Sequence, residues 1–160
     1  MAATFRKYDA LLIDPDIASR MRLKQATTAV TNFGKVTQIN NLREAGDKLK
    51  ANEHCDVAFI SFKCDLSDAA SFVKSAKSLP AAQDAAFILV LGGSGQDSST
   101  VASSVMSGFD GCLFEPFSVD MLLEITEIAA RVRKERSRAR EEAALRLLMT
   151  DLMNQIGVVG

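Results

Sequence analysis

The chain has 160 residues, of which 48% are hydrophobic and 24% are charged, and its formal net charge at pH 7 is −1. The balanced charge excludes a bulk electrostatic attraction to nucleic acid or to an anionic membrane, while the apolar content suffices for a core. We expect no membrane span, because no run of about 18 apolar residues occurs, and no signal peptide, because residues 1–14 contain no apolar signal core. We therefore expect a cytoplasmic protein, in which Cys55, Cys64 and Cys112 are reduced thiols.

Short apolar runs alternate with amphipathic stretches along most of the chain. In chain order, we expect a strand at 8–14, a helix at 17–31, a strand at 35–40, a helix at 42–52, a strand at 55–61 and a helix at 67–79. Pro80 ends that helix, and then come a continuous apolar strand at 86–91, a helix at 96–107 ended by Gly108, and a strand at 111–114. A final helix begins after Pro116, with Ser118 as its N-cap.

Five successive strand–helix units predict an α/β fold, with a parallel sheet covered by helices on both faces. Their combined length fits a flavodoxin-like doubly wound sheet of five strands in the order 2-1-3-4-5, followed by a long C-terminal helix. Ligands in this fold bind outside the carboxyl ends of the strands. The loops of interest are therefore those that follow Asp14, Ser61, Leu91 and Phe114.

Three stretches in this order carry a resemblance to a known family. They are LLIDPDIASR at 11–20, DVAFIS at 56–61 and GFDGCLFEPFS at 108–118. Together they resemble the receiver domain of two-component response regulators over about residues 7–132. The resemblance implies phosphoryl transfer to an aspartate at the end of the third strand, with Mg²⁺ held by two acids, a Thr or Ser after the fourth strand and a Lys after the fifth.

Most of the parts of that chemistry are replaced in this chain. Asp14 matches the first acid, but Pro15 stands at the position of the second, with Asp16 next to it. The resemblance therefore implies a degenerate phosphoacceptor pocket that cannot be phosphorylated in the usual way. The residues at its positions are Asp14, Pro15, Asp16, Ser61 as the acceptor, Gly92 for the Thr or Ser, Cys112 for an aromatic switch residue, and Glu115 for the Lys. The family also implies a cis bond between Glu115 and Pro116.

The residues of the pocket predict no enzyme activity and no cofactor. A serine hydroxyl needs a base to become nucleophilic, and the only histidine, His54, precedes the third strand, at its opposite end. Asp14 and Asp16, with Glu115 nearby, are the candidates for a metal site. The alternative is a partly solvated acidic rim, in which contact between like charges raises the carboxyl pKa values.

The last helix is longer than the domain needs. It continues from 118 to 156 without Gly or Pro, a length of roughly 58 Å, whereas a domain of this size is about 35 Å across. We expect a receiver-like domain at 1–132 and a helical extension at 133–160, which is either a coiled coil or a linker to an output domain. The apolar stripe changes face near Glu141–Ala144, which indicates a register shift, a hinge or a second interface. The predicted interface residues are Ile125, Ala129, Val132, Ala139, Ala143, Leu145, Leu148, Leu152 and Ile156.

These observations favour a receiver-like signalling protein that acts through protein contacts, as a homodimer or as a link to an output module. One alternative is an atypical phosphoacceptor that uses Asp65 or Asp68. A second alternative is an adaptor for nucleic acid or a membrane surface, which would use the basic segment 131–140. We do not expect nucleic acid as a partner, because the basic side chains of this segment point all round the helix, as on a solvated surface.

Overall fold

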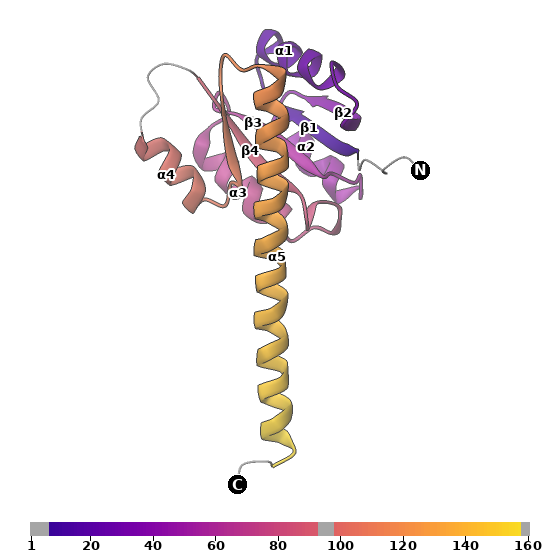
Figure 1. Cartoon of the computed structure of the whole chain (residues 1–160), viewed down its shortest axis with the longest axis vertical. Coiled ribbons are helices and arrows are strands. Elements are labelled where there is room, and N and C mark those ends of the chain that lie inside the picture. Colours follow the sequence, from indigo (N-terminus) through magenta and orange to yellow (C-terminus); the bar gives the residue numbers. More distant parts are fainter. Residues whose placement is uncertain (1–6, 93–97, 158–160) are drawn as a thin grey trace.

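The structure is a computed structural model that describes residues 7–92 and 98–157. Strands and helices alternate along the chain (Figure 1). The elements are β1 (Tyr8–Ile13), α1 (Ile17–Thr28), β2 (Phe33–Ile39), α2 (Leu42–Lys50), β3 (Val57–Ser61), α3 (Leu66–Ala76), the short 3-10 helix η1 (Pro80–Ala82), β4 (Ala86–Leu91), α4 (Ser98–Met106), β5 (Gly111–Phe114) and α5 (Val119–Gln155). The strands form one parallel sheet in the order β2-β1-β3-β4-β5, which confirms the predicted fold class and strand order.

Two hydrophobic cores lie on the two faces of the sheet, because successive strand residues point in opposite directions. Leu11 and Ile13 of β1 belong to the core shared with α2 and α3, whereas Ala10 and Leu12 belong to the core shared with α1 and α5. The central strands β3 and β4 are buried along their whole lengths. This explains why their sequences read as unbroken apolar runs.

Helix boundaries follow the expected local signals with small shifts. Gly108 has a φ of 98°, the left-handed conformation expected of a glycine that ends a helix. The Oγ of Ser118 accepts a hydrogen bond of 3.1 Å from the backbone N–H of Met121, which confirms the predicted N-cap of α5. Pro80 does not simply end α3, because that helix ends at Ala76 and Pro80 starts η1. Residues 96 and 97 of the helix predicted at 96–107 lie outside the described residues.

Helix α5 is one continuous helix that crosses the domain and then projects away from it (Figure 1). Its buried side chains are Leu122, Thr126, Ala129, Arg133 and Ser137, and residues 138–157 are exposed throughout. The packed part thus reaches Ser137, beyond the boundary predicted at 132. No break separates the two halves of the helix at Glu141–Ala144, so this stretch is not a hinge here. Among the described residues, no helix has the length and apolar character needed to cross a membrane.

Polar side chains of α5 attach it to the amino edge of the sheet. Arg133 is 3% exposed and donates a short hydrogen bond to the backbone carbonyl of Gln83. Arg136 lies 3.1 Å from the carboxylate of Asp110. The Oγ of Ser137 donates a hydrogen bond of 3.0 Å to the carboxylate of Asp84. The expectation of a solvated basic segment is therefore wrong for Arg133, which is buried, whereas Arg136 stays exposed to solvent while it contacts Asp110. We call Arg133, Arg136 and Ser137 the α5 latch.

Candidate functional site

The residues predicted from the resemblance come together at the carboxyl edge of the sheet. Parallel register places Asp14 after β1, Ser61 at the end of β3, Gly92 after β4 and Glu115 after β5 along one edge. Asp14 and Ser61 are buried, with 5% and 2% of their surfaces exposed. The expected cis bond between Glu115 and Pro116 is present.

Both acids after β1 are used to start α1. The carboxylate of Asp14 accepts a hydrogen bond of 2.8 Å from the backbone N–H of Asp16 and a short one from the Oγ of Ser19. Asp16 is the N-cap of α1, and its Oδ2 accepts a hydrogen bond of 3.2 Å from the backbone N–H of Ser19. Pro15 lies exposed between them. The two candidates for a metal site thus both have protein partners that stabilise the start of the helix.

A lysine that the sequence reasoning missed reaches this edge from the loop after β3. The Nζ of Lys63 lies 2.8 Å from Oδ2 of Asp16. Chiefly through this hydrogen bond, and also through those from Ser19, the pKa of Asp16 is lowered from 3.8 to about 2. The same contact raises the pKa of Lys63. The prediction of raised carboxyl pKa values is therefore wrong for Asp16, because a cation rather than a second carboxylate is its nearest charged neighbour.

A second cation lies at the far side of the rim. The Nη2 of Arg22, on α1, lies 3.4 Å from Oε2 of Glu115. Glu115 therefore has an ion-pair partner even though it replaces the lysine expected at this position. Lys63 and Arg22 thus pair with two of the three carboxylates at this edge, those of Asp16 and Glu115.

The acceptor position is held by the hydroxyl of Ser61, and the position of the Thr or Ser is held by Gly92. The Oγ of Ser61 accepts a hydrogen bond of 3.1 Å from the backbone N–H of Lys63. The ring of Phe62 lies against Gly92, and a Cβ at Gly92 would come within 3.2 Å of that ring. A threonine or serine at this position would require the Phe62 ring to shift by a few tenths of an ångström. Phe62 is the second residue of this site that sequence reasoning missed, although both it and Lys63 directly follow the buried strand.

Cys112 lies away from these side chains, although it is on β5. Its Sγ is 3.4 Å from the Oγ of Ser104 on α4, and the side chain packs against the core on the face of α2 and α3.

A shallow hollow of about 690 Å³ adjoins the site between α1 and the start of α5. Its lining combines apolar and charged side chains, including Arg22, Ala26, Phe62, Lys63, Glu115, Phe117 and Val119.

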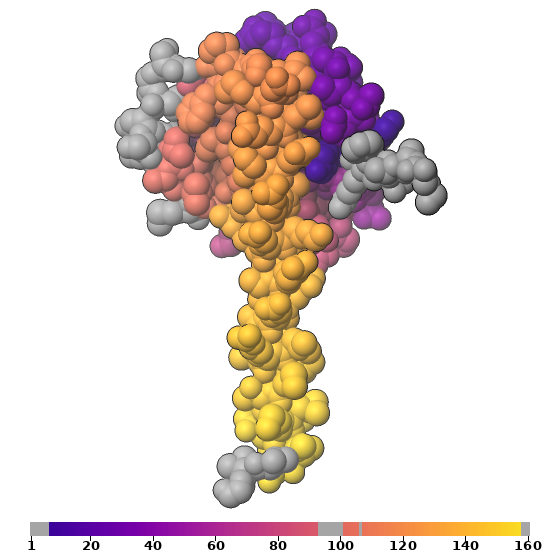
Figure 2. Space-filling view, viewed as in Figure 1, coloured from indigo at the N-terminus to yellow at the C-terminus, as the bar shows by residue number. Residues whose placement is uncertain are grey.

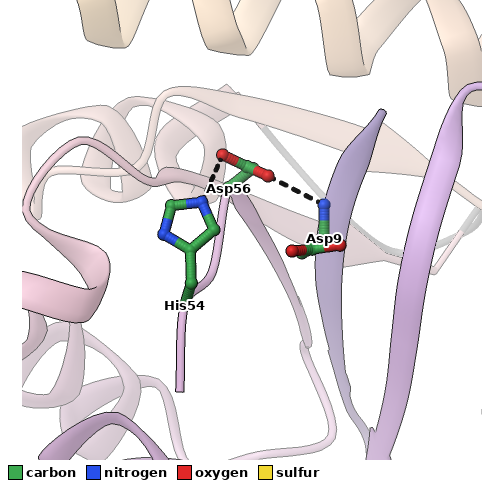
Figure 3. A group of neighbouring side chains, drawn as sticks. All are labelled: Asp9, His54 and Asp56. Carbon is green, nitrogen blue, oxygen red and sulfur yellow. Dashed lines mark hydrogen bonds and ion pairs between the residues drawn. The ribbon is translucent and has the colours of Figure 1, made fainter. Parts of the chain in front are cut away.

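At the opposite, amino edge of the sheet, a second group of polar side chains contains the only histidine (Figure 3). The carboxylate of Asp56 lies 2.8 Å from Nε2 of His54 and accepts a hydrogen bond of 2.9 Å from the backbone N–H of Asp9. The carboxylate of Asp9 accepts one of 2.9 Å from the N–H of Lys35. Ligand atoms of Asp9, His54 and Asp56 lie within 4.8 Å of one another, the one such group of three among the described residues. Its hydrogen bonds join the segments that begin β1, β2 and β3, and they place His54 far from Ser61, as predicted.

The predicted interface residues fall into two groups. Ala129 is fully buried against the sheet, and Ile125 and Val132 are half-buried. Packing inside the domain therefore removes Ala129 from any surface available to a second chain. The others are exposed on the projecting half of α5: Ala139, Ala143, Leu145, Leu148, Leu152 and Ile156.

Comparison with known proteins gives structural matches only. No family model matches the sequence, and no curated protein matches it. A CheY-like response regulator receiver domain protein from Methanospirillum hungatei JF-1 is 19% identical, with a TM-score of 0.64 over 81% of this chain and 98% of that one. A response regulator receiver modulated diguanylate cyclase from Pelobacter carbinolicus is 23% identical, with a TM-score of 0.59 over 82% and 98%.

A third match is an adenylate cyclase structure from Rhodopirellula baltica, which is 15% identical, with a TM-score of 0.65 over 86% of this chain and 98% of that one. These identities are low, but the matched structures are covered almost completely. The chain therefore has the fold of response regulator receiver domains, to which an extended last helix is added.

Proposed function

We propose that this chain is a receiver-fold signalling module that works through protein contacts, without phosphorylation at the carboxyl edge. In the second half of the proposal, the contact surface is the exposed part of α5, and two copies of the chain pair through it. The observation that carries the first half is the buried Ser61 at the end of β3, whose hydroxyl accepts the Lys63 N–H. Phosphoryl transfer to a protein side chain requires a nucleophile and cations that offset the charge of the phosphate. A neutral hydroxyl without a neighbouring base does not supply the nucleophile.

The cations near Ser61 are already engaged. Lys63 pairs with Asp16, and Arg22 pairs with Glu115. Binding a phosphoryl group here would require one of these pairs to break, and the carboxylate of Glu115 would repel the incoming charge. The site therefore supports a fixed arrangement, in which both cations are already paired, better than a phosphorylation switch.

The contact surface is supported by the apolar side chains of the projecting helix. Leu145, Leu148, Met149, Leu152 and Ile156 are between 55% and 66% exposed. Contiguous exposed apolar patches mark interaction sites, and a helix without tertiary contacts is marginal in water. Pairing with a second copy would cover these side chains. A link to an output module is the other use of the same helix, and the similar protein from Pelobacter carbinolicus is a diguanylate cyclase modulated by a receiver.

Incubation of the full chain with labelled acetyl phosphate and Mg²⁺ tests the first half of the proposal. We expect no covalent label. A Ser61→Asp, Gly92→Thr, Glu115→Lys variant is the matched control, because it restores the acceptor and both phosphate contacts. Near-stoichiometric label on the natural sequence would overturn the proposal, and label mapped to Asp65 or Asp68 would establish the atypical-acceptor alternative. Asp65 is already the N-cap of α3, where its carboxylate accepts the N–H of Asp68 at 2.9 Å.

Sedimentation velocity over a range of concentrations tests the second half. We expect a dimer that dissociates in a Leu152→Asp variant, because each copy would place a charge in the apolar contact. Leu147→Asp is the control, because Leu147 is 69% exposed and lies on roughly the opposite side of the helix. A monomer at every concentration would refute dimerisation. Loss of the dimer in both variants alike would show that the apolar stripe is not the contact.

The adaptor alternative loses support from the α5 latch. Arg133 is buried, and Arg136 contacts Asp110, so neither presents a free cation to a polyanion. The rest of the basic segment has acidic neighbours at Glu135, Glu141 and Glu142.

A further inference from the structure

The outer face of α5 carries apolar side chains at seven-residue spacing near both of its ends. Met121, Ile128, Met149 and Ile156 occupy one position of the repeat and are 44%, 40%, 56% and 66% exposed. Leu145 and Leu152 occupy the second position, four residues before Met149 and Ile156. This spacing is the a and d pattern of a coiled coil. Between the two apolar ends, the same positions hold Arg131, Glu135, Arg138 and Glu142, all exposed.

This face is open to a second helix. At 3.6 residues per turn, it points roughly 150° away from the buried stripe that contains Leu122 and Ala129. Figure 2 shows the outer surface of α5 uncovered across the domain and into the projecting part. Met121 and Ile128 are therefore exposed on the part of α5 that covers the sheet. A contact limited to the projecting half of α5 would leave these two side chains uncovered.

We infer that two copies of this chain pair through the outer faces of α5 in antiparallel orientation, an inference that rests on the proposed function and assigns its geometry. The pattern of side chains is complementary to its own reverse. When Met121 lies opposite Leu152 of the partner subunit, Ile128 lies opposite the partner's Leu145. In the same register, Arg131 lies opposite the partner's Glu142, and Glu135 lies opposite the partner's Arg138. The twofold axis makes each of these contacts occur twice.

Charge decides between the two orientations. In a parallel pair in register, each core residue meets itself, so Arg131, Glu135, Arg138 and Glu142 would form four consecutive layers of like charge. The antiparallel pair converts all four layers into Arg–Glu contacts and adds Lys134 opposite the partner's Glu141 at its flank. Opposing like charges are destabilising to a degree similar to that by which opposite charges stabilise. The antiparallel pair has one mismatch, Glu124 opposite the partner's Met149.

The overlap length points the same way. Antiparallel pairing in this register overlaps both helices from Met121 to Leu152, which is roughly 47 Å. A pair restricted to the apolar residues 145–156 would overlap over only about 17 Å. The long overlap also brings the C-terminal end of the partner's α5 to the start of α5, where Val119 lines the hollow at the carboxyl edge. Each subunit would then place the end of its long helix next to the degenerate pocket of the other.

Cysteine cross-linking of the full chain distinguishes the orientations. A tagged Ile128→Cys chain mixed with an untagged Leu145→Cys chain is expected to form a mixed cross-linked dimer under a short bismaleimide, while neither variant alone cross-links above the background. The natural chain, with Cys55, Cys64 and Cys112, gives that background. Cross-linking of Leu145→Cys to itself would identify a parallel pair and overturn the inference while leaving dimerisation intact. A monomer in sedimentation would instead refute the proposed function.

Charge reversal provides a second test that does not depend on thiols. Arg131→Glu and Glu142→Arg are each expected to raise the dimer dissociation constant about tenfold, since each reverses two symmetric contacts. The double variant is expected to return to within about threefold of the natural chain. In a parallel pair the two residues lie roughly 16 Å apart along the axis, so absence of rescue would contradict the antiparallel register. Arg140→Glu, on the helix side away from this face, is the control and should change the constant little.

Discussion

Helix α5 approaches the sheet so closely at Gly111 that a single methyl group there should loosen its packing. A Cβ at Gly111 would lie 2.9 Å from Cδ1 and 3.3 Å from Cγ1 of Ile125, and 3.6 Å from the Cβ of Ala129. Carbon atoms pack best at about 3.5–4.0 Å. In Gly111→Ala, the side chain of Ile125 must therefore move by roughly 0.7 Å, or α5 must shift.

The expected cost is a modest loss of stability. Overpacking of this kind typically costs about 1–3 kcal/mol, and the replacement of glycine by alanine in the unfolded chain recovers about 0.4–1 kcal/mol. We expect a net loss of about 1–2 kcal/mol in the free energy of unfolding. Because the chain has no Trp, urea unfolding followed by far-ultraviolet circular dichroism is the appropriate assay, at one fixed protein concentration so that dimerisation does not contribute differently.

A double variant and a matched glycine make the test specific. Ile125→Val removes the Cδ1 atom that would be struck, so the double variant should lose at least about 0.5 kcal/mol less than the sum of the single variants. Gly46, inside α2, has nothing within 4 Å of its added Cβ, so Gly46→Ala should instead stabilise the protein by about 0.5–1 kcal/mol. A neutral or stabilising Gly111→Ala, or strict additivity with Ile125→Val, would refute the steric reasoning.

Three further outcomes are expected. The pKa of Asp16 is lowered from 3.8 to about 2, so its contribution to stability is present above pH 3.8 and is lost as the pH falls toward 2. In Lys63→Met, nuclear magnetic resonance titration of the carboxyl carbon of Asp16 should give a pKa closer to 3.8. An unchanged pKa would contradict the ion pair. Asp110→Ala should lower the free energy of unfolding in urea by roughly 2–4 kcal/mol, because the buried N–H of Phe87 and the guanidinium of Arg136 lose their acceptor. Asp110→Asn should lower it less, because asparagine keeps one acceptor oxygen. Burial raises the pKa of Cys55 to about 12 and that of Cys64 to about 11. Mass spectrometry after Ellman labelling of the native protein at mildly alkaline pH should therefore find Cys55 unmodified and Cys64 modified far more slowly than in urea. Rapid labelling of Cys55 in the native protein would contradict its burial.

Local pattern predicted the architecture well because its signals are short-range. The strands expected at 86–91 and 111–114 have those bounds in the structure, and the expected cap at Ser118 is formed. Once the strand–helix alternation is known, chain handedness leaves few topologies for a parallel sheet. The meeting of Asp14, Ser61 and Glu115 at one edge follows from that topology alone.

The contacts within the site could not be predicted in the same way. Lys63 and Asp16 are far apart in the sequence, and their ion pair depends on how the loop after β3 turns toward α1. Phe62 against Gly92 depends on the same loop. Sequence reasoning therefore counted the carboxylates of the rim correctly but gave the wrong direction to the pKa of Asp16, because the neighbouring cation comes from another element.

The long helix separates the two kinds of information most clearly. Its length, its unbroken character and the charge pattern of its outer face are properties of the sequence by itself, because they depend only on residue spacing along one helix. Which face is buried was decided by the tertiary structure. Arg133 and Ser137 have the polarity of surface residues, yet they are buried because the carbonyl of Gln83 and the carboxylate of Asp84 lie opposite them at the amino edge of the sheet. A polar residue is buried when a partner compensates its desolvation, and that partner is supplied by the fold.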